Sequence, residues 1–287
     1  MADRSPLTAT WTASDGYPIH VATWTAATGG SPRARVVVLH GVQSHGGWYH
    51  RLGRSLSDSG YEAHFPDRRG SGANRVDRGH APSMARLFDD VAEYLARLKA
   101  IDPPAPIALA GISWGAKLAI ATAGRRPDLV EALALICPGL HPRVGVSRSE
   151  RLRIALAYLL QPKKTFPIPL SDPALFTDNP EGQAFIAADP LGLRAATARL
   201  LATSVFIDRV VARIPSRVHQ PSLLMLAGRD RIVDNDKTRA YFDRLASTDR
   251  RVIDYPEGHH TLEFDPDPDR YALDLAAWLG SVLPIRA

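Results

Sequence analysis

The sequence predicts an α/β protein whose mainly parallel sheet is covered by helices on both faces and interrupted by one helical insertion. Apolar, β-branched runs alternate with stretches of helical period along most of the 287 residues, and this alternation is typical of parallel sheets. The alternation stops at residue 139 and resumes after 219. We therefore expect an α/β core at 1–138 and 220–287, with a helical cap, or lid, at 139–219.

The core elements follow from their residue patterns. LTATWTA and PIHVATWTA, separated by Ser14-Asp15-Gly16, predict an antiparallel hairpin. Apolar runs predict buried strands, and amphipathic stretches predict helices, of which the one at 83–100 begins with Ser83 as its N-cap. The expected strands are 35–40, 61–66, 107–111, 132–137, 222–227 and 251–255, and the expected helices are 48–57, 83–100, 117–123, 237–245 and 269–279.

The insertion is predicted to hold helices near 151–160 and 193–211, separated by the proline-punctuated PKKTFPIPLSDPALFTDNPEG. Long insertions of this kind are usually functional; the alternative is a helical pair that only completes the core. The first helix carries an apolar face, which we expect to roof an acyl pocket or pack on the core, with docking on a membrane as the alternative. This face consists of Leu152, Ala155, Leu156, Leu159 and Leu160.

The net charge of +5 is concentrated in the insertion. Residues 139–219 hold 11 Lys/Arg against 6 Asp/Glu, whereas the remainder holds 24 of each. Because no Lys/Arg block has interleaved aromatic residues, we expect no nucleic-acid partner. The basic insertion is either an ordinary solvated surface or a peripheral contact with an anionic lipid surface.

Other features of the composition narrow the class of protein. The balance of 45% hydrophobic and 23% charged residues is not that of a disordered chain. A single cysteine, Cys137, excludes an intrachain disulfide. No apolar run is long enough to span a bilayer, and the N-terminal MADRSPLTATWTASDG lacks the pattern of a secretory signal. We expect a cytoplasmic protein.

The segment Gly111-Ile112-Ser113-Trp114-Gly115 has the G-x-S-x-G pattern and lies between the apolar run PIALA and the helical AKLAIATAG. A sharp strand-to-helix turn lifts the serine hydroxyl clear of the sheet, and its glycines admit close backbone contacts. The helix N-terminus offers N–H groups where an oxyanion develops. This context makes Ser113 the predicted nucleophile.

A serine nucleophile needs a histidine base held by a carboxylate, in the chain order Ser, acid, His. Asp230 follows the apolar strand in LLMLAGRDRIVD, and His259 and His260 follow the next strand in RVIDYPEGHHTLEF. We predict Asp230 as the acid and leave both histidines open on this evidence.

Two other patterns are expected to be structural. His259 and Glu263 lie four residues apart, but no third ligand is nearby and no H-E-x-x-H occurs, so we expect no metal and no cofactor. Asp67 precedes Arg68-Arg69, and we expect a structural ion pair there.

These segments together resemble the monoglyceride-lipase and lysophospholipase branch of the α/β-hydrolase superfamily. This branch is also described as serine aminopeptidase-like. The resemblance implies the α/β-hydrolase fold, with a mostly parallel eight-stranded sheet flanked by helices and a helical cap insertion. It covers nearly the whole chain and rests on LHGVQSHGGWY, PDRRGSG, DRGHAPSMARLFDDV, GISWG, NPEGQAFIAADPL, LAGRDRIVD and PEGHHTLEF.

The resemblance also implies roles for individual residues. Val42 and Trp114 would supply the oxyanion N–H groups, Asp230 rather than Asp234 would be the acid, and His260 rather than His259 the base. The chain departs from the family where Gln43-Ser44-His45 replaces the usual Gly-Glu-His and where Trp48 precedes the tyrosine in place of the frequent arginine.

The predicted activity is hydrolysis of a carboxylic ester, expected to be a small-molecule or lipid ester such as a monoacylglycerol or lysophospholipid, through a Ser-His-Asp acyl-enzyme mechanism. One alternative keeps the triad and changes the bond, as in a thioesterase, amidase or peptidase. Another is a non-catalytic ligand-binding protein of this fold. Ser113 excludes dehalogenase and epoxide hydrolase chemistry, which needs an aspartate at that position.

Overall fold

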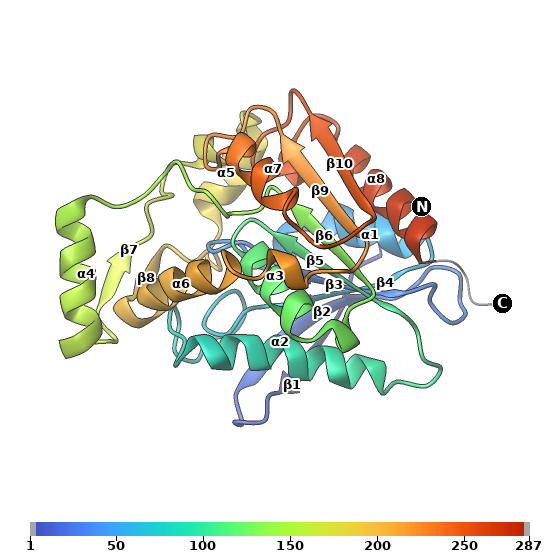
Figure 1. Ribbon diagram of the computed structural model, residues 1–287, viewed down its shortest axis with the longest axis horizontal. Coiled ribbons are helices and arrows are strands. Elements are labelled where there is room, and N and C mark those ends of the chain that lie inside the picture. Colours follow the sequence, from blue (N-terminus) through green and yellow to red (C-terminus); the bar gives the residue numbers. More distant parts are fainter. Residues whose placement is uncertain (1–3, 284–287) are drawn as a thin grey trace.

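The computed structural model describes residues 4–283, in which a central sheet carries helices on both faces (Figure 1). The ends of the predicted core, residues 1–3 and 284–287, lie outside the described residues. In chain order the elements are β1 (Leu7–Thr12), β2 (Pro18–Trp24), β3 (Arg35–Leu39), α1 (His50–Asp58), β4 (Glu62–Pro66), α2 (Met84–Lys99), β5 (Ile107–Ile112), α3 (Gly115–Arg125), β6 (Ala132–Ile136), α4 (Arg148–Leu160), β7 (Thr165–Pro167), α5 (Pro180–Ala188), β8 (Ala195–Thr197), α6 (Ala198–Val211), β9 (Ser222–Ala227), α7 (Asn235–Phe242), β10 (Arg250–Tyr255) and α8 (Pro268–Val282).

The sheet has eight strands in the order β1-β2-β4-β3-β5-β6-β9-β10. The β1–β2 and β2–β4 pairs are antiparallel, and the other pairs are parallel. The predicted mainly parallel sheet and its α/β class are confirmed. In register, Leu39 pairs with Gly111 and Ile112 pairs with Ile136, so β3, β5 and β6 end level with one another. The loops that follow these strands therefore meet at one edge of the sheet.

Alternate side chains of the buried strands enter two separate cores. Val37 and Leu39 of β3 pack with the residues of α2 and α3, whereas Val36 and Val38 pack with those of α1 and α8. This is the two-residue period of a strand buried on both faces. Each fully buried aliphatic side chain contributes about 1.5–3 kcal/mol, so both layers hold the sheet rigid beneath the loops at its edge.

Helix α2 begins where the sequence predicts. The Ser83 hydroxyl accepts a hydrogen bond from the Arg86 N–H, and the first helical residue is Met84. Such a cap stabilises a helix by about 1 kcal/mol because it satisfies a backbone donor that has no partner within the helix.

The inserted segment, residues 139–219, follows β6 and precedes β9 and contains α4, α5, α6 and a two-stranded antiparallel sheet of β7 and β8. The small sheet and α5 were not predicted. Pro180 occupies the first turn of α5 after Asn179, whose side chain accepts from the Glu181 N–H. A proline at that position begins a helix rather than breaking one. The division into core and cap remains a prediction.

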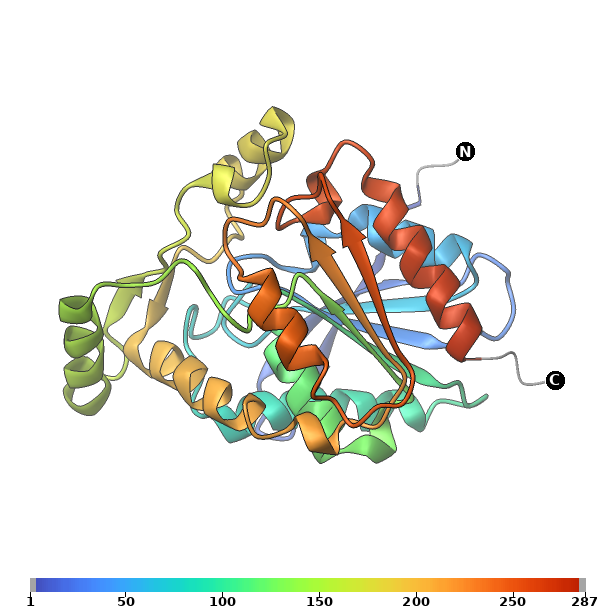
Figure 2. The ribbon, with the colours of Figure 1, turned by 45° about the horizontal axis from the view of Figure 1, so that its top comes forward.

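Helix α4 differs from its prediction in the face that it buries. Ile154 and Ala157 pack against α6, whereas Leu152 is 72% and Leu159 is 74% exposed. The expectation that the leucine face roofs a pocket or packs on the core is therefore wrong. Figures 1 and 2 both place α4 at the edge of the molecule, far from the central eight-stranded sheet.

Between residues 4 and 283, no helix combines the length and apolar character needed to cross a bilayer.

Candidate active site

Ser113 occupies the turn between β5 and α3 with a φ of +51°, a left-handed conformation that non-glycine residues rarely adopt. The turn is sterically tight. A Cβ at Gly111 would lie 2.8 Å from the Ala116 nitrogen, and a Cβ at Gly115 would clash with the Leu39 carbonyl oxygen. Glycine is therefore required at both flanking positions, and the strained turn projects the Ser113 side chain above the sheet edge.

The structure brings Ser113, Asp230 and His260 together. His260 Nε2 lies 2.9 Å from Ser113 Oγ, and His260 Nδ1 lies 2.8 Å from Asp230 Oδ2. The other Asp230 oxygen accepts the N–H groups of Ile232 and Val233 at 2.8 and 2.9 Å. These two backbone donors hold the carboxylate in place beneath the imidazole.

The contacts determine which nitrogen of His260 carries a proton. A carboxylate only accepts hydrogen bonds, so Nδ1 donates to Asp230 and, in the neutral ring, Nε2 accepts from the Ser113 hydroxyl. The His260 and Asp230 side chains are 2% and 0% exposed, so water does not compete for these contacts. The arrangement allows His260 to remove the Ser113 proton when the oxygen attacks an electrophile.

The alternative acid and base have other partners. Asp234 is the N-cap of α7, where its side chain accepts from the Lys237 N–H at 3.1 Å. His259 lies between two carboxylates, with Nδ1 3.0 Å from Asp265 and Nε2 2.9 Å from Asp178. Both ring nitrogens of His259 therefore face carboxylates, and neither faces Ser113.

Val42 and Trp114 lie next to Ser113. Val42 lines the same cavity as Ser113, and a Cβ at the preceding Gly41 would come 3.4 Å from the Ser113 Cβ. Trp114 is the N-cap residue of α3. Among residues 4–283, neither the Val42 nor the Trp114 backbone N–H donates a hydrogen bond to another protein group. Both donors are therefore free to bind an oxygen at the serine.

The loop after β3 is tied to the inserted segment through Asp189. One oxygen of this carboxylate accepts from Trp48 Nε1 at 2.7 Å and lies 3.2 Å from His45 Nε2. The Gln43 carbonyl accepts from the Leu193 N–H at 2.8 Å. Trp48, which stands where the related family often has an arginine, thus contributes a neutral donor to the same carboxylate.

The cavity beside Ser113 is small. Its volume is about 10 Å³, which is room for about one water molecule. Leu170 and Phe176 of the inserted segment line it together with the loop after β3, and the Phe176 ring lies edge-on to the His260 ring at 6.1 Å. The sequence offered no signal for these two residues because they lie in the proline-punctuated segment.

The structure corrects the predicted role of Asp67. Its carboxylate accepts the N–H groups of Gly46 and Ala73, both at 2.8 Å, and lies 3.3 Å from His20. The expected ion pair with Arg68-Arg69 does not form in the described part of the chain. Arg69 binds Asp90 and Asp15 instead. Residues that are adjacent in a turn point in different directions, which is why adjacency misled the prediction.

Glu263 and His259 also have different partners. Glu263 accepts from the Arg51 N–H at 2.6 Å at the start of α1, and burial raises the pKa of its carboxyl to about 7. Within residues 4–283 no three His, Cys, Asp or Glu side chains are grouped to hold a metal ion.

Comparisons with known proteins agree with this architecture. The family model described as serine aminopeptidase, S33, matches residues 30–267. The chain is 26% identical over 265 residues to a monoacylglycerol lipase of Mycolicibacterium smegmatis, covering 91% of this chain and 92% of the relative. It is 25% identical over 241 residues to the phospholipase YtpA of Bacillus subtilis, covering 82% and 91%. A soluble variant of a Saccharomyces cerevisiae monoglyceride lipase, solved with a substrate analogue, superposes with a TM-score of 0.85 at 19% identity, covering 98% and 97%.

Proposed function

Since the chain belongs to the serine aminopeptidase, S33, family, we propose a function for it within the monoglyceride-lipase-like branch of the α/β-hydrolases. We propose that it hydrolyses a monoacylglycerol- or lysophospholipid-like ester through Ser113, His260 and Asp230. It is a carboxylic-ester hydrolase. The observation that carries the proposed mechanism is the pair of hydrogen bonds of 2.9 and 2.8 Å that links the three side chains.

In this mechanism Ser113 Oγ attacks the ester carbonyl carbon while His260 Nε2 takes the hydroxyl proton. The C–O bond to the leaving alcohol then breaks, and His260 gives the proton to that alcohol, which leaves an acyl group on Ser113. Water, deprotonated by His260, attacks the acyl carbon. The bond between that carbon and Ser113 Oγ then breaks, His260 returns the proton to Oγ, and the fatty acid is released. Asp230 holds Nδ1 and stabilises the imidazolium that forms in each half of the cycle.

The negative charge that develops on the carbonyl oxygen needs donors that are already in position. The free backbone N–H groups of Val42 and Trp114 are proposed to supply them. Removal of one such donor in serine hydrolases costs on the order of 10²–10³ in kcat.

The proposed substrate is far larger than the cavity of about 10 Å³. We propose that Leu170 and Phe176, which line it, move when an acyl chain enters. We propose that the inserted segment, residues 139–219, is a cap that opens by such a movement, with the contacts of Asp189 as its attachment to the loop after β3.

The exposed side of α4 is proposed to contact an anionic lipid surface. Leu152, Leu156, Leu159 and Leu160 are 56–74% exposed. Arg148, Arg151 and Arg153 on the same helix are exposed as well, although Arg153 pairs with Glu150. Exposed leucines bordered by basic residues are the combination that binds at a charged membrane interface.

A substrate panel tests the function. Purified protein is assayed with monoacylglycerols, lysophospholipids, p-nitrophenyl esters, acyl thioesters and peptide amides, each also against Ser113→Ala. Lipid esters are expected to have the highest kcat/KM, and Ser113→Ala is expected to lose activity with all of them. A preference for thioesters or amides would replace the ester assignment, and absence of turnover throughout would support a ligand-binding protein.

A further inference from the structure

Arg68 is a buried cation that forms no ion pair among residues 4–283. Arg68 is 9% exposed, and the neighbouring Asp67 carboxylate accepts the N–H groups of Gly46 and Ala73 instead of binding the guanidinium. Burial lowers the pKa of the Arg68 guanidinium to about 10, so it stays charged at neutral pH. An unpaired buried charge costs several kcal/mol. Arg69, by contrast, binds the carboxylates of Asp90 and Asp15.

The guanidinium donates to two successive carbonyls of the loop after β3. Arg68 Nη1 lies 3.1 Å from the Gly41 oxygen, and Nη2 lies 2.9 Å from the Val42 oxygen. The planar fork of arginine suits such a two-point contact, which lysine cannot reproduce. The Gly41 carbonyl belongs to the same peptide group as the Val42 N–H, so a donor on that oxygen fixes the direction of that N–H.

His40 also binds the Gly41 carbonyl oxygen of this peptide group. Its Nε2 accepts from the Arg68 backbone N–H at 2.8 Å, so in the neutral ring Nδ1 carries the proton and donates to the Gly41 oxygen at 2.8 Å. Burial lowers the pKa of His40 to about 3, which keeps the ring neutral. Two donors thus bind one carbonyl oxygen, and hydrogen bonding to a carbonyl also polarises the N–H of the same peptide.

The same guanidinium lies over the Trp114 ring, 4.7 Å from its centroid. The backbone of Arg68 is itself fixed, because its carbonyl accepts from the Ser71 hydroxyl and from Asn74 Nδ2. One anchored side chain therefore contacts the loop that carries the Val42 N–H and the residue that carries the Trp114 N–H.

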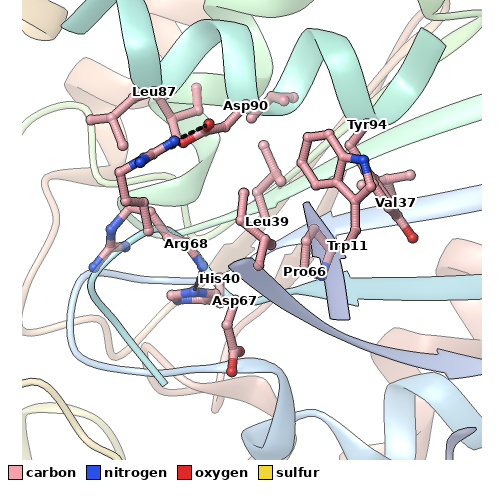
Figure 3. A pocket seen from close by; sticks show the side chains of 14 residues that line it. Trp11, Val37, Leu39, His40, Pro66, Asp67, Arg68, Leu87, Asp90 and Tyr94 are labelled. Atoms are coloured by element: carbon pink, nitrogen blue, oxygen red, sulfur yellow. Dashed lines mark hydrogen bonds and ion pairs between the residues drawn. The ribbon is translucent and has the colours of Figure 1, made fainter. Parts of the chain in front are cut away.

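Figure 3 shows Arg68 and His40 together at one end of a separate cavity of about 40 Å³, with Trp11 and Tyr94 at the other end. Ser113 does not line this cavity. Arg68 therefore lines this separate cavity and not the cavity beside the serine. A flexible side chain of similar or smaller volume fits at this position without overpacking.

We propose that Arg68 is the positioning residue of the oxyanion hole: through Gly41, Val42 and Trp114 it sets the spacing of the two N–H donors and adds positive charge behind them. The inference rests on the proposed function and deepens it. Because the donors act on the charge that develops in the transition state, Arg68 affects kcat and the binding of transition-state analogues while leaving ground-state binding unchanged.

The test compares Arg68→Met and Arg68→Lys with wild type and with the control Arg69→Met, which also removes a buried arginine. For each protein we measure kcat, KM, the Ki of an acyl trifluoromethyl ketone, the Ki of the fatty-acid product and the melting temperature. Arg68→Met is expected to lower kcat by about tenfold to a hundredfold, less than the loss of a donor itself, with KM within threefold. The ketone Ki should rise by the factor by which kcat/KM falls, and the product Ki should not change.

Arg68→Lys keeps the charge but spans only one carbonyl, so it is expected to lie between wild type and Arg68→Met. Arg69→Met is expected to lower the melting temperature and keep kcat within threefold. A folded Arg68→Met with wild-type kcat and ketone Ki would overturn the inference, and if that variant does not fold, Arg68→Lys decides by the same criteria. Failure of the proposed function is recognised separately, because it appears in the wild-type protein as the absence of ester hydrolysis.

Discussion

The Nε2 atom of His260 lies 2.9 Å from the Oγ of Ser113, although 147 positions separate the two residues. The parallel sheet accounts for this proximity, because the turn after β5 and the loop after β10 lie at the same edge. His259, one residue earlier, points instead to Asp178 and Asp265. The conformation of the loop after β10 thus directs His260 to Ser113 and His259 to two carboxylates.

Replacement of each histidine separates these tasks. His260→Ala is expected to lower kcat by about 10⁴- to 10⁶-fold, because in the described part of the chain His260 is the base that contacts the Ser113 hydroxyl. His259→Ala is expected to stay within about tenfold of wild type and to lose about 1–3 kcal/mol of unfolding free energy, because it leaves the largely buried Asp265 carboxylate without this partner. Steady-state kinetics and urea unfolding measure both quantities. A dead His259→Ala beside an active His260→Ala would reverse the assignment.

The two candidate acids are separated in the same way. Asp230→Asn is expected to lower kcat by about 10⁴-fold, since an amide nitrogen facing Nδ1 favours the wrong tautomer of His260. Asp234→Asn keeps a good N-cap for α7, and it is expected to change stability by less than 1 kcal/mol and activity hardly at all. Equal losses of kcat in the two variants would argue against Asp230 as the partner of His260.

Burial of His40 predicts how stability depends on pH. Its folded pKa is lowered from 6.5 to about 3, so between these values the unfolded chain binds more protons than the folded one. The contribution of neutral His40 to the unfolding free energy is therefore fully present above pH 6.5. It is lost as pH falls toward 3, at up to about 1.4 kcal/mol per pH unit. Urea unfolding from pH 7 to 4.5 is compared for wild type and His40→Asn, which cannot titrate. Slopes of equal steepness would contradict a neutral, buried His40.

The exposed leucines of α4 predict binding to lipid surfaces. Replacing Leu152, Leu156 and Leu159 together by serine is expected to weaken co-sedimentation with anionic phospholipid vesicles at least tenfold, while kcat for a short soluble ester stays unchanged. Leu7→Ser, at an exposed position on β1, is the matched control. Binding of the wild type should also fall as salt rises, because the arginines of α4 act over about 8 Å at physiological ionic strength. Unchanged binding of the triple variant would assign α4 to an ordinary solvated surface.

The sequence predicted the elements whose patterns are strong. The strand at 222–227 is found as Ser222–Ala227, and Ser83 caps α2 as expected. Helix α5 escaped prediction because closely spaced prolines are typical of a loop. The buried face of α4 differs from its prediction because Ile154 and Ala157 are fewer than the leucines on its exposed side. Pattern analysis assumes that the more apolar face is buried, and the exposed leucines of α4 violate that assumption.

The site was predictable to the extent that it follows the ends of strands. Chain order and chemistry named Ser113 and Asp230 and left His259 and His260 open, and the family resemblance indicated His260. The structure places Ser113, Asp230 and His260 in contact. Their catalytic roles remain predictions. The sequence predicted only an ion pair for Arg68, because its proposed role depends on carbonyls 26 and 27 positions away that sequence spacing does not bring near it.

The central claim is that Ser113 is an activated nucleophile, and covalent labelling tests it most directly. Wild-type protein is treated with a fluorophosphonate and digested, and the modified peptide is identified by mass spectrometry, with Ser113→Ala as the control. We predict one phosphonate, on Ser113, with complete loss of ester hydrolysis in proportion to labelling and no modification of the variant. Labelling at another residue, or hydrolysis by Ser113→Ala at the wild-type rate, would contradict the assignment.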